Sequence, residues 1–476
     1  MNDNQFINRK KEITWLNERY EAINKEAQLL IIYGKRRVGK TELVRHFLKD
    51  KPHVYYLANR GNAELHLQSA ISVLTQKLGP TPLPGTAFST WREFFDYLGK
   101  VTKDLKEPMV LVFDEFPFLV ESDSGMSSYF QYGWDMYLKD RKLMVILMGS
   151  SISMMYKHTL VYSAPLYGRR TGQWLLQPFT YEDSKNFYSN APFGNTFPLY
   201  AISGGIPAYA RVFDGNKTLR QNIEQYILPE GSFLGVEPEL LLSEEFEDPR
   251  SYLGILKAIG LGRTKFSEIV QAAGVPSTAL PGYLKTLTQL RLVKKEAPIT
   301  DKIPEKSKKG TYSLSDAFLR FYFSFIFPNM SLAKGANHDG LFETRGEILT
   351  QLVAKSYEDT TEEFIARATN NGRLPVFDAL GRWWDKETEI DLVGLNERNN
   401  SILFVETKWN TKPIGTEVLN DLKNKSSKVV WGKPGRKEHF ALVAKGGFTD
   451  ELIAQAKRES VLLIQENSIL EQQGGK

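Results

Sequence analysis

The first part of the chain alternates short apolar runs with longer stretches of helical periodicity. Residues 28–34 (QLLIIYG) form an apolar run that ends in glycine, and after it Leu43, Phe47 and Leu48 recur at the spacing of one helix face. Further apolar runs lie at residues 53–58, 109–113, 143–148 and 174–176. Runs this apolar are typical of strands buried on both faces of a parallel sheet. The pattern therefore predicts an α/β domain over residues 1–212, with helices covering the sheet.

The middle of the chain reads as consecutive helices followed by a hairpin. Residues 251–262, 265–274 and 277–290 have helical patterns, with Ser277 as the expected cap of the last one. The runs RLVKKEAP and GTYSLSD, which come next, can pair as two antiparallel strands. This order of elements resembles a winged helix. We therefore predict a helical segment and a winged helix over residues 213–316.

The last part of the chain has the pattern of a small separate α/β domain. A helical linker is expected at residues 317–340, and the domain itself at residues 341–476. It begins with a long helical pattern (GEILTQLVAKSYEDTTEEFI) and continues with two alternating runs, EIDLVGL and SILFVETKW. The polar turn at residues 396–400 separates these runs, so the sequence predicts a helix followed by an antiparallel strand pair.

The amino-acid composition excludes several classes of protein and of functional site. The 476 residues include 61 Lys and Arg against 56 Asp and Glu, and the net charge of +5 excludes a histone-like polycation. With 42% hydrophobic and 25% charged residues the chain matches the globular average, which excludes global disorder. The absence of cysteine excludes disulfides, thiol nucleophiles and Cys-ligated metal centres. Neither a signal peptide nor a membrane-spanning run is recognisable, so we expect a cytoplasmic protein without a membrane partner.

The loop after the first apolar run carries a nucleotide-binding motif. The sequence GKRRVGKT fits G-x-x-x-x-G-K-[ST] between a predicted strand and a predicted helix. Gly34 and Gly39, with Val38 in the loop between them, let backbone N–H groups turn toward phosphate. Lys40 would reach the β- and γ-phosphates, and the hydroxyl of Thr41 would bind Mg²⁺. ATP and Mg²⁺ are therefore the expected cofactors.

A second acidic motif completes the expected ATPase site. The apolar residues 110–113 bring Asp114 and Glu115 to the end of a predicted strand. Asp114 would hold the Mg²⁺ shell, and Glu115 would polarise the water that attacks the γ-phosphate. Adjacent acids at a strand end are often merely solvated, but the matched loop motif favours the catalytic interpretation.

Several segments together resemble the archaeal-type ATPase family, a branch of the AAA+/STAND P-loop proteins. They are FINRKKEITWL, IIYGKRRVGKTELV, LVFDEFPFL, GSSISMM, SAPLYGRRTG and GGIPAY, and the resemblance covers essentially the whole chain. It implies that Ser150 is the sensor of the γ-phosphate and that Pro207 packs near the base. It also implies that Arg169 or Arg170 matches the family's arginine pair. An arginine finger often acts from a neighbouring subunit, so a homo-oligomer and an ordinary surface arginine pair both stay open.

The winged helix is a poor candidate for reading base sequence. Exposed positions of its last helix are expected at Thr278, Pro281, Lys285 and Thr288, and side chains that read base edges are scarce among them. The wing at residues 299–310 carries four lysines, Lys302, Lys306, Lys308 and Lys309, against Asp301 and Glu305. A structural or phosphate-contacting role is favoured over sequence readout, and a solvated loop is the alternative.

Carboxylates in the third unit suggest a second metal site. Residues two apart in a strand share a face, so Glu406 and Lys408 project together, and a turn near residue 398 would place Asp391 opposite about residue 405. The pattern resembles the core of PD-(D/E)XK restriction-endonuclease-like nucleases. That resemblance implies that Asp391 and Glu406 bind Mg²⁺, that Lys408 activates the attacking water, and that Glu358 is the first acid.

Two alternatives for these carboxylates remain open at this stage. Asp359, Glu362 and Glu363 lie close enough to Glu358 in sequence to replace it as the first acid. Solvated strand faces with cross-strand Lys–Glu pairs would also give this pattern. Acids flanked by Ile390, Leu392 and Val405 favour a site, although nuclease-like folds also serve as inactive binding platforms.

The sequence as a whole predicts a P-loop ATPase whose nucleotide state controls a C-terminal Mg²⁺-dependent nuclease acting on DNA. ATP or ADP and DNA are the expected partners. The main alternative is a nucleotide-switched DNA-binding or scaffold protein with a catalytically silent third domain. A ring-forming ATPase motor is a weaker alternative, which would require Arg169 or Arg170 to act on a neighbouring subunit.

Overall fold

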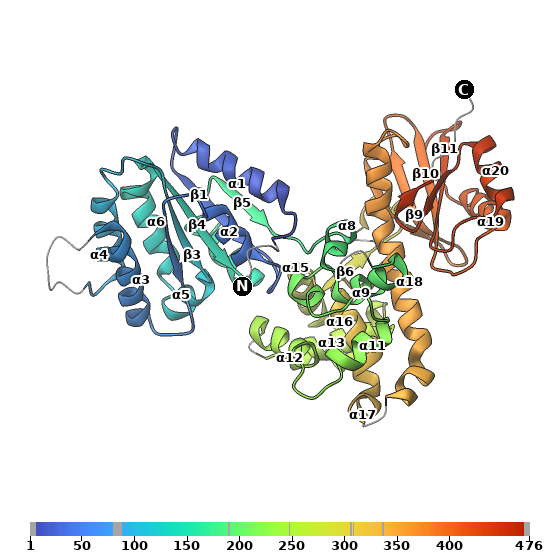
Figure 1. Ribbon diagram of the computed structural model, residues 1–476, viewed down its shortest axis with the longest axis horizontal. Coiled ribbons are helices and arrows are strands. Elements are labelled where there is room, and N and C mark those ends of the chain that lie inside the picture. The colour runs from blue at the N-terminus through green and yellow to red at the C-terminus, as the bar shows by residue number, and fades with distance from the viewer. Residues whose placement is uncertain are drawn as a thin grey trace. The chain divides into compact units, whose positions relative to one another are not determined.

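The computed structural model describes residues 6–79, 88–188, 191–246, 248–304, 307, 309–335 and 338–470. The chain forms two compact units, whose helices and strands are labelled in Figure 1. The first unit comprises Met1–Phe179 and Ile206–Ala208, and the second comprises Thr180–Gly205 and Tyr209–Lys476. Residues 180–205, which the sequence analysis assigned to the first domain, therefore pack within the second unit. Across the part of the chain that is described, no helix is both long enough and apolar enough to cross a membrane.

The first unit is built on a five-stranded sheet whose strands are all parallel, as the apolar runs predict. The strands are β1 (Gln28–Tyr33), β2 (His53–Leu57), β3 (Met109–Asp114), β4 (Leu143–Gly149) and β5 (Gly172–Leu175), in the spatial order β2-β3-β4-β1-β5. β1, β3 and β4 are adjacent and almost fully buried. Their carboxyl ends consequently meet at one edge of the sheet, where α/β proteins bind their ligands.

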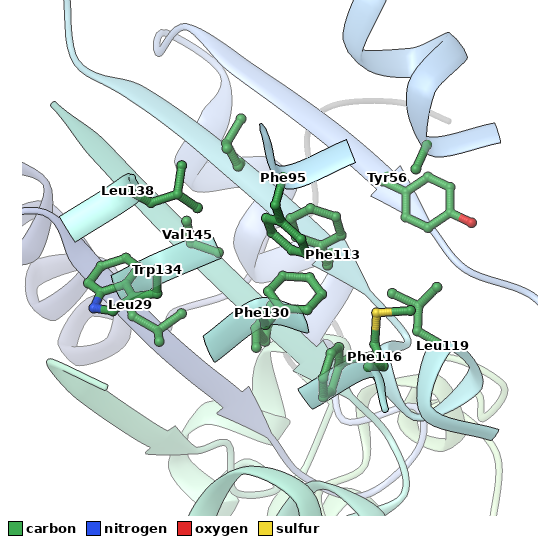
Figure 2. Packing of buried hydrophobic residues seen from close by; sticks show 14 of the residues in the cluster. Leu29, Tyr56, Phe95, Phe113, Phe116, Leu119, Phe130, Trp134, Leu138 and Val145 are labelled. Carbon is green, nitrogen blue, oxygen red and sulfur yellow. The ribbon is translucent and has the colours of Figure 1, made fainter. Parts of the chain in front are cut away.

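Helices cover both faces of this sheet. They are α1 (Lys10–Ala22), α2 (Lys40–Leu48), α3 (Ala63–Leu78), α4 (Trp91–Val101), α5 (Phe116–Ser122), α6 (Met126–Met136) and α7 (Ile152–Met155), with short 3-10 and π turns at Leu138–Asp140 and Tyr156–Leu160. Figure 2 shows the core between β-strands and helices, in which the ring of Phe130 lies 4.9 Å from that of Phe95 and 4.8 Å from that of Phe113. A Cβ on Gly133 would lie 2.2 Å from the Phe95 ring, so this glycine permits the close approach of α4 and α6.

The second unit opens with short helices around an aromatic cluster. The helices are α8 (Tyr181–Ser184), α9 (Phe193–Ser203), α11 (Leu219–Tyr226) and α12 (Phe233–Glu245), with a 3-10 turn at Lys185–Phe187. The short helix α10 (Pro207–Ala210) begins in the first unit and ends in the second. The ring of Phe197 lies 5.1 Å from that of Tyr181 and 5.2 Å from that of Tyr357, which belongs to the C-terminal part of the chain. These buried aromatic contacts explain why residues 180–205 pack with the second unit.

Three helices and a two-stranded antiparallel sheet follow. They are α13 (Arg250–Gly260), α14 (Phe266–Ala273), α15 (Leu280–Gln289), β6 (Val293–Glu296) and β7 (Thr311–Leu314). The expected cap at Ser277 is wrong, because α15 begins at Leu280 and Ala279 precedes it without a side-chain cap. Pro281 therefore lies in the first turn, where its missing N–H has no intrahelical acceptor to lose. The four positions of this segment predicted to be exposed are exposed.

A bent helical segment and one long helix lead into the C-terminal sheet. The segment contains α16 (Ala317–Phe321), a π turn at Tyr322–Ile326, a 3-10 turn at Phe327–Asn329 and α17 (Met330–Ala333), and it is mostly buried. The long helix α18 spans Asp339–Asn370, so it begins earlier and ends later than the sequence pattern indicated. Its buried side chains, which include Tyr357 and Phe364, pack against the strands that follow.

The C-terminal sheet is mixed and has helices on both faces. Its strands are β8 (Ala379–Trp384), β9 (Glu389–Asn396), β10 (Ser401–Lys408), β11 (Lys437–Ala444), β12 (Leu462–Gln465) and β13 (Ser468–Ile469), in the order β13-β12-β11-β10-β9-β8. Ile402 and Phe404 belong to the core cluster that includes side chains of α19 (Thr416–Ser426) and α20 (Asp450–Glu459). Leu403 and Val405 belong to the cluster that includes α18. This strict alternation sends the next residue, Glu406, to the α19 face.

The loop between β6 and β7 packs on the edge of the C-terminal sheet. Ile299 donates its N–H to the carbonyl of Arg382 in the edge strand β8, at 2.9 Å, and its side chain joins the core cluster on the α19 face. The start of the predicted wing is therefore fixed to β8, and it covers part of this edge strand. Lys302 and Lys309 of the loop are exposed, whereas Glu305, Lys306 and Lys308 lie outside the described residues.

Candidate nucleotide and carboxylate sites

The GKRRVGKT loop leaves β1 and enters α2, as its motif requires. Gly34 lies where an added Cβ would meet the carbonyl oxygen of Leu176 at 2.5 Å, and Gly39 has a φ of +96°, so both positions need glycine. Val38 is fully buried. The N-terminal end of α2 therefore adjoins the loop, which is an arrangement suited to phosphate.

The side chain of Lys40 folds back over the loop. Its Nζ donates to the carbonyl oxygens of Gly34 at 3.0 Å and Lys35 at 3.1 Å, and the residue is only 5% exposed. The ammonium group is thus held inside the curve of the loop. This is the position from which a lysine can turn to the β- and γ-phosphates of a bound nucleotide.

Asp114 lies at the end of β3 within a network of hydrogen bonds. Its Oδ2 accepts a bond from Thr41 Oγ1 at 2.9 Å and another from the hydroxyl of Tyr55, and its Oδ1 accepts the N–H of Glu115 at 2.9 Å. Burial, with the charge of Asp114, raises the pKa of Tyr55 far above its usual range, so this tyrosine remains a donor. Tyr55, which the sequence analysis missed, comes from β2, the strand paired with β3.

Glu115 and Ser150 contact each other across adjacent strand ends. Both carboxylate oxygens of Glu115 accept the Ser150 hydroxyl at 2.8 Å, and one also accepts the Ser150 N–H at 3.1 Å. Glu115 has a φ of +55°, a conformation that costs a non-glycine residue of order 1 kcal/mol. The strained backbone and the hydroxyl together fix the carboxylate beside the loop strand. Pro207 also lies in this unit, with its Cγ 3.9 Å from the position of a Cβ on Gly39.

Arg9 connects the phosphate-binding loop to the segment that follows β5. It is 6% exposed and donates to the carbonyl oxygens of Val38 at 2.9 Å and Gln177 at 2.8 Å, while its guanidinium lies 4.0 Å from the ring centre of Phe179. Asn8 and Arg9 lie in the opening segment FINRKKEITWL, whose sequence pattern predicts no role for them. The contacts assign Arg9 a positioning role, because it holds the Val38 carbonyl in place.

Replacing Arg9 with alanine is expected to weaken ATP binding about tenfold, because losing charged hydrogen bonds to the loop costs about 1–2 kcal/mol of preorganisation. The measurement is the dissociation constant of a fluorescent ATP analogue, with the melting temperature recorded for each variant. The matched control is Lys10→Ala, which alters an exposed neighbour. Equal affinity in Arg9→Ala and the wild type would contradict the positioning role.

The two candidate finger arginines are held within the first unit. Arg169 pairs with Asp135 through Nε and Nη2, with the shortest distance at 2.7 Å, and it also donates to the carbonyl of Pro165. Arg170 donates to the carbonyl of Tyr167 at 2.9 Å and lies over its ring. Neither arginine contacts Lys40, Asp114 or Glu115 through a hydrogen bond or ion pair of the described residues, so the structure does not bring them into the nucleotide site.

In the second unit, Asp391 stands at the start of β9 beside β10. The last pair of the ladder joins Leu392 to Val405, which differs by one residue from the predicted register. The Oδ2 of Asp391 accepts the N–H of Thr407 at 2.8 Å. Burial raises the pKa of Asp391 to about 7, with further contributions from the charges of Glu406 and Glu358. The other two acids named by the motif therefore act electrostatically on Asp391.

Glu406 is buried and engaged by two lysines. It is 4% exposed and accepts Lys408 Nζ at 2.7 Å and Lys425 Nζ at 3.1 Å and 3.2 Å. Burial alone would lower the pKa of Lys425, but Glu406 and Asp421 raise it, so the ammonium form is maintained. Lys425 was missed from the sequence because it lies on α19, outside the strand motif.

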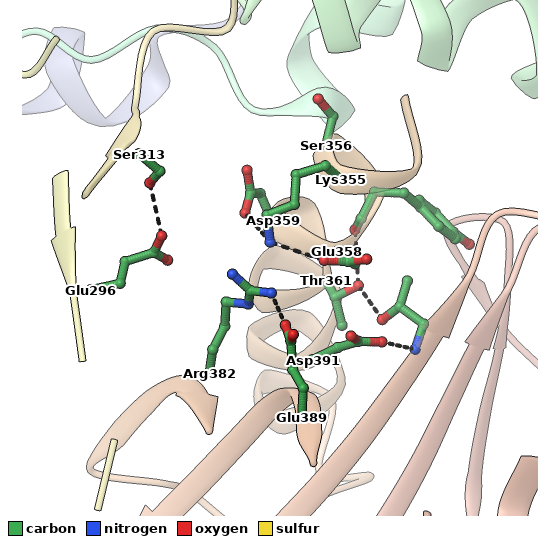
Figure 3. A network of polar contacts seen from close by, with 12 residues as sticks. Glu296, Ser313, Lys355, Ser356, Glu358, Asp359, Thr361, Arg382, Glu389 and Asp391 are labelled. Carbon is green, nitrogen blue, oxygen red and sulfur yellow. Dashed lines mark hydrogen bonds and ion pairs between the residues drawn. The ribbon is translucent and has the colours of Figure 1, made fainter. Parts of the chain in front are cut away.

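The neighbouring acids of α18 have different surroundings, which Figure 3 shows together with Asp391. Glu358 accepts Lys355 Nζ at 2.9 Å. Asp359 is paired with Arg320 at 2.7 Å and Lys294 at 3.7 Å. Burial alone would raise the pKa of Asp359, but these charges outweigh it and hold the pKa well below the usual range. Asp359 therefore links α18 to the hairpin strand β6, and Glu358 is the acid that faces Asp391.

Glu363, another alternative first acid, lies away from Asp391 among aromatic side chains. It accepts the N–H of Tyr181 at 3.3 Å and the hydroxyl of Tyr200 at 3.5 Å. Burial raises its pKa from 4.5 to about 7, although these two bonds oppose the shift. The native state thus holds a proton that the unfolded chain releases near pH 4.5. The resulting stabilisation is complete below about pH 4.5 and is lost as the pH rises through 7.

Replacing Glu363 with glutamine is expected to raise stability by about 2 kcal/mol at pH 8 and to change it little at pH 5, because an amide keeps both acceptor bonds without a buried charge. Chemical denaturation at the two pH values measures the difference. Glu362→Gln alters an exposed acid at the adjacent position and serves as the control. The same shift at both pH values would show that Glu363 does not titrate in this range.

The donor chemistry of both sites fits Mg²⁺. Thr41 and Asp114 offer a hydroxyl and a carboxylate at the phosphate-binding loop, and Asp391 and Glu406 offer two carboxylates, which are the hard oxygen ligands that Mg²⁺ uses together with waters and substrate phosphate. No group of three or more acidic or histidine side chains close enough to hold a metal is found in the described part of the chain. Either ion would therefore need additional oxygens from water or substrate.

Comparison with known proteins identifies the family. A family described as an ATPase domain predominantly from Archaea matches residues 6–209. An uncharacterised protein of Methanocaldococcus jannaschii is 34% identical over 446 residues, which cover 92% of this chain and 95% of that protein. The chain belongs to this archaeal ATPase family. The ATPase domain thus lies in the part of the chain that carries the GKRRVGKT loop. A second family, described as archaeal and bacterial proteins of unknown function, matches residues 322–428.

One solved structure supports the fold of this archaeal ATPase, and a second is similar to a lesser degree. A Walker-type ATPase of Pyrococcus abyssi is 22% identical, with a TM-score of 0.51, over 67% of this chain and 97% of its own. The ORC2 protein of Aeropyrum pernix, in ADPNP and ADP complexes, is 15% identical, with a TM-score of 0.43, over 71% of this chain and 98% of its own. The first likeness confirms the P-loop ATPase fold predicted from the sequence.

Proposed function

We propose that the protein binds and hydrolyses ATP in its first unit and that its C-terminal domain is a Mg²⁺-dependent nuclease acting on DNA. The observation that carries the proposal is the presence of two separate carboxylate sites in one chain. One joins Thr41 and Asp114 at a phosphate-binding loop, and the other joins Asp391 and Glu406 beside a lysine. The membership of the ATPase family supports the first half.

In the first site, each residue has a defined task. The loop N–H groups and Lys40 bind the phosphates, while Asp114, oriented by Tyr55 and Thr41, presents a carboxylate. Glu115, held by Ser150, accepts a proton from the attacking water. When bound, Mg²⁺ supplies charge neutralisation at the phosphates. Ser150 connects Glu115 to the end of β4, the strand next to β1, and by the family resemblance it would sense the γ-phosphate.

In the second unit, we propose that the helices α13, α14 and α15 and the β6–β7 hairpin form a winged helix. We also propose that the C-terminal sheet has a restriction-endonuclease-like fold. Asp391 and Glu406 would hold a metal ion together with oxygens of water and substrate, and Glu358 would add its negative charge from α18. Mg²⁺, when bound, supplies a polarised water and neutralises a phosphodiester. Lys408 projects from the same strand face as Glu406 and would orient the water against the scissile phosphate.

We further propose that nucleotide state controls the nuclease. Contacts of Lys40, Thr41 and Ser150 with the γ-phosphate would favour one arrangement of the ATPase core, and hydrolysis would remove them. The candidate finger arginines would then act only in an assembly of subunits. Because Arg169 is already paired with Asp135, recruitment of Arg169 would require that ion pair to open.

The test is cleavage of plasmid and linear DNA by the purified full-length protein with Mg²⁺ or Mn²⁺, with and without ATP. Cleavage that disappears in Asp391→Ala is the expected result. Lys40→Ala is expected to keep the site but to abolish the effect of ATP, because the P-loop lysine contacts the phosphates. Cleavage that persists in Asp391→Ala would overturn the nuclease assignment, and an unchanged ATP effect in Lys40→Ala would overturn the control by nucleotide.

A second candidate function is a nucleotide-switched DNA-binding or scaffold protein with a silent third domain. The engagement of Glu406 by two ammonium groups favours it, because both cations compete with a metal for the carboxylate. This candidate predicts DNA retained in a gel shift, with retention changed by ATP, and no cleavage with either metal. Retention that decreases with salt would indicate phosphate contacts.

A further inference from the structure

The carboxylate of Glu406 receives two ammonium groups that differ in how they are held. Lys425 Nζ bridges both oxygens, at 3.1 Å and 3.2 Å, whereas Lys408 Nζ reaches only Oε1, at 2.7 Å. Oε1 therefore accepts both lysines and Oε2 accepts Lys425 alone. A carboxylate left in the interior without a counter-ion is costly, so at least one of the two ammonium groups must stay.

Lys425 is anchored and Lys408 is not. Lys425 lies on α19, its side chain is 22% exposed, and its Nζ also pairs with Asp421 at 3.1 Å, one helical turn earlier. Lys408 is the last residue of β10, with a side chain 42% exposed, and among the ion pairs of the described residues it joins Glu406 alone. Lys425 therefore has two acidic partners and little access to solvent, whereas Lys408 has one acidic partner at the open end of the strand.

We propose that Lys425 is the fixed counter-ion of Glu406, which leaves Lys408 able to exchange between Glu406 and a phosphate of the substrate. Lys425 is a positioning residue in this arrangement, since it acts through Glu406. A flexible lysine that binds a carboxylate as a point charge can leave it when a second cation remains in place. The phosphate in this proposal rests on the proposed nuclease function, but the different roles of the two lysines do not.

The opposite arrangement would give different behaviour. If Lys408 were the fixed partner, removing Lys425 would leave Lys408 unchanged, because Lys408 would already be bound at all times. If Lys425 is the fixed partner, its removal makes Lys408 the sole counter-ion of a buried carboxylate. Lys408 then spends less time in solvent, and its amine becomes less reactive.

The test is the rate of lysine acetylation by a water-soluble acylating reagent, followed at each residue by peptide mass spectrometry of the metal-free full-length protein. In the wild type, Lys408 is expected to react about tenfold faster than Lys425, because an ammonium held in an ion pair with little solvent access is protected. In Lys425→Met, the acetylation of Lys408 is expected to slow about fivefold, as that lysine becomes the only counter-ion.

Two further variants make the result specific. Lys425→Arg keeps a cation at this position and is expected to leave the acetylation rate of Lys408 at the wild-type value. Lys423→Met alters a lysine of the same helix that pairs with Glu459 and is expected to have no effect. Equal acetylation rates of Lys408 and Lys425 in the wild type would overturn the proposal even if Lys425→Met did not fold. An unchanged Lys408 rate in folded Lys425→Met would overturn it as well.

Cleavage kinetics separate this inference from the proposed function. If the wild type cleaves DNA, Lys425→Met is expected to lower kcat about fivefold with little change in KM, because Lys408 is retained on Glu406, and Lys425→Arg is expected to restore kcat. A change in KM with an unchanged kcat in Lys425→Met would overturn the exchange of Lys408. If the wild type does not cleave DNA, the proposed function fails, whereas the acetylation rates still decide which lysine is fixed.

Discussion

Replacing Glu115 with glutamine is expected to lower the rate of ATP hydrolysis at least about 100-fold and to leave the affinity for ATP within about threefold of the wild type. Glutamine keeps the shape of the side chain and one acceptor for the Ser150 hydroxyl. It cannot take a proton from the attacking water. The residue does not contact Lys40 or Thr41 through any hydrogen bond of the described residues, so phosphate binding should be preserved.

Single-turnover hydrolysis and equilibrium binding of a fluorescent ATP analogue measure the two quantities separately. Glu42→Gln is the matched control, since Glu42 is an exposed acid in the first turn of α2. Ser150→Ala is expected to slow hydrolysis only about tenfold, because the carboxylate stays but loses an orienting hydrogen bond worth about 1 kcal/mol. If Glu115→Gln lost affinity and rate in parallel, the residue would bind the nucleotide and would not act as the base.

The sequence alone was sufficient where a local pattern and a chemical motif agree. The buried strands before Gly34, Asp114 and Ser150 are each defined by an uninterrupted apolar run, and parallel pairing brings their carboxyl ends to one edge. The loop and the two acids consequently meet in space without any information on long-range contacts. Tyr55 was missed because its contact with Asp114 depends on the order of strands in the sheet, which apolar runs do not specify.

The sequence predicted the residues of the C-terminal site but not the exact pairing register of β9 and β10. A turn centred near residue 398 placed Asp391 opposite residue 405, whereas the four-residue turn Glu397–Asn400 pairs Asn396 with Ser401 and moves the register by one. Asn396 stabilises this turn by accepting the N–H of Asn399 at 2.9 Å. Because side chains alternate between faces, a shift of one residue changes which side chains lie opposite each other.

Long-range partners were beyond the reach of sequence patterns. Lys425 lies on a separate helix, and a lysine on a polar helix face is ordinarily solvated. Its contact with Glu406 exists only because α19 packs on the face of β10 to which Glu406 points. Arg9 was missed for a related reason. Arg9 directly precedes α1, and its guanidinium donates to two carbonyl groups that are distant in the sequence. Every residue has a backbone carbonyl, so a sequence pattern cannot predict which one an arginine contacts.

Replacing Glu406 with glutamine is expected to lower DNA cleavage at least about 1,000-fold, because a neutral amide is a poor ligand for a divalent cation. The same change is expected to cost about 3 kcal/mol of stability, because it removes the buried carboxylate shared by Lys408 and Lys425 and leaves the largely buried Lys425 with the exposed Asp421 as its remaining acidic partner. Cleavage assays and chemical denaturation measure these effects. Glu438→Gln is the control, since it alters an exposed acid of the adjacent strand β11 that pairs with Arg436.

A double variant distinguishes charge imbalance from loss of packing as the cause of this destabilisation. In Glu406→Gln with Lys425→Met, the ammonium group that has lost its buried counter-ion is also removed. The double variant is therefore expected to be more stable than Glu406→Gln alone, by about 1 kcal/mol or more, and still inactive in cleavage. Equal or lower stability of the double variant would mean that the lysine contributes chiefly through the packing of its stem, and the ion pair would then not be the main stabilising contact of Glu406.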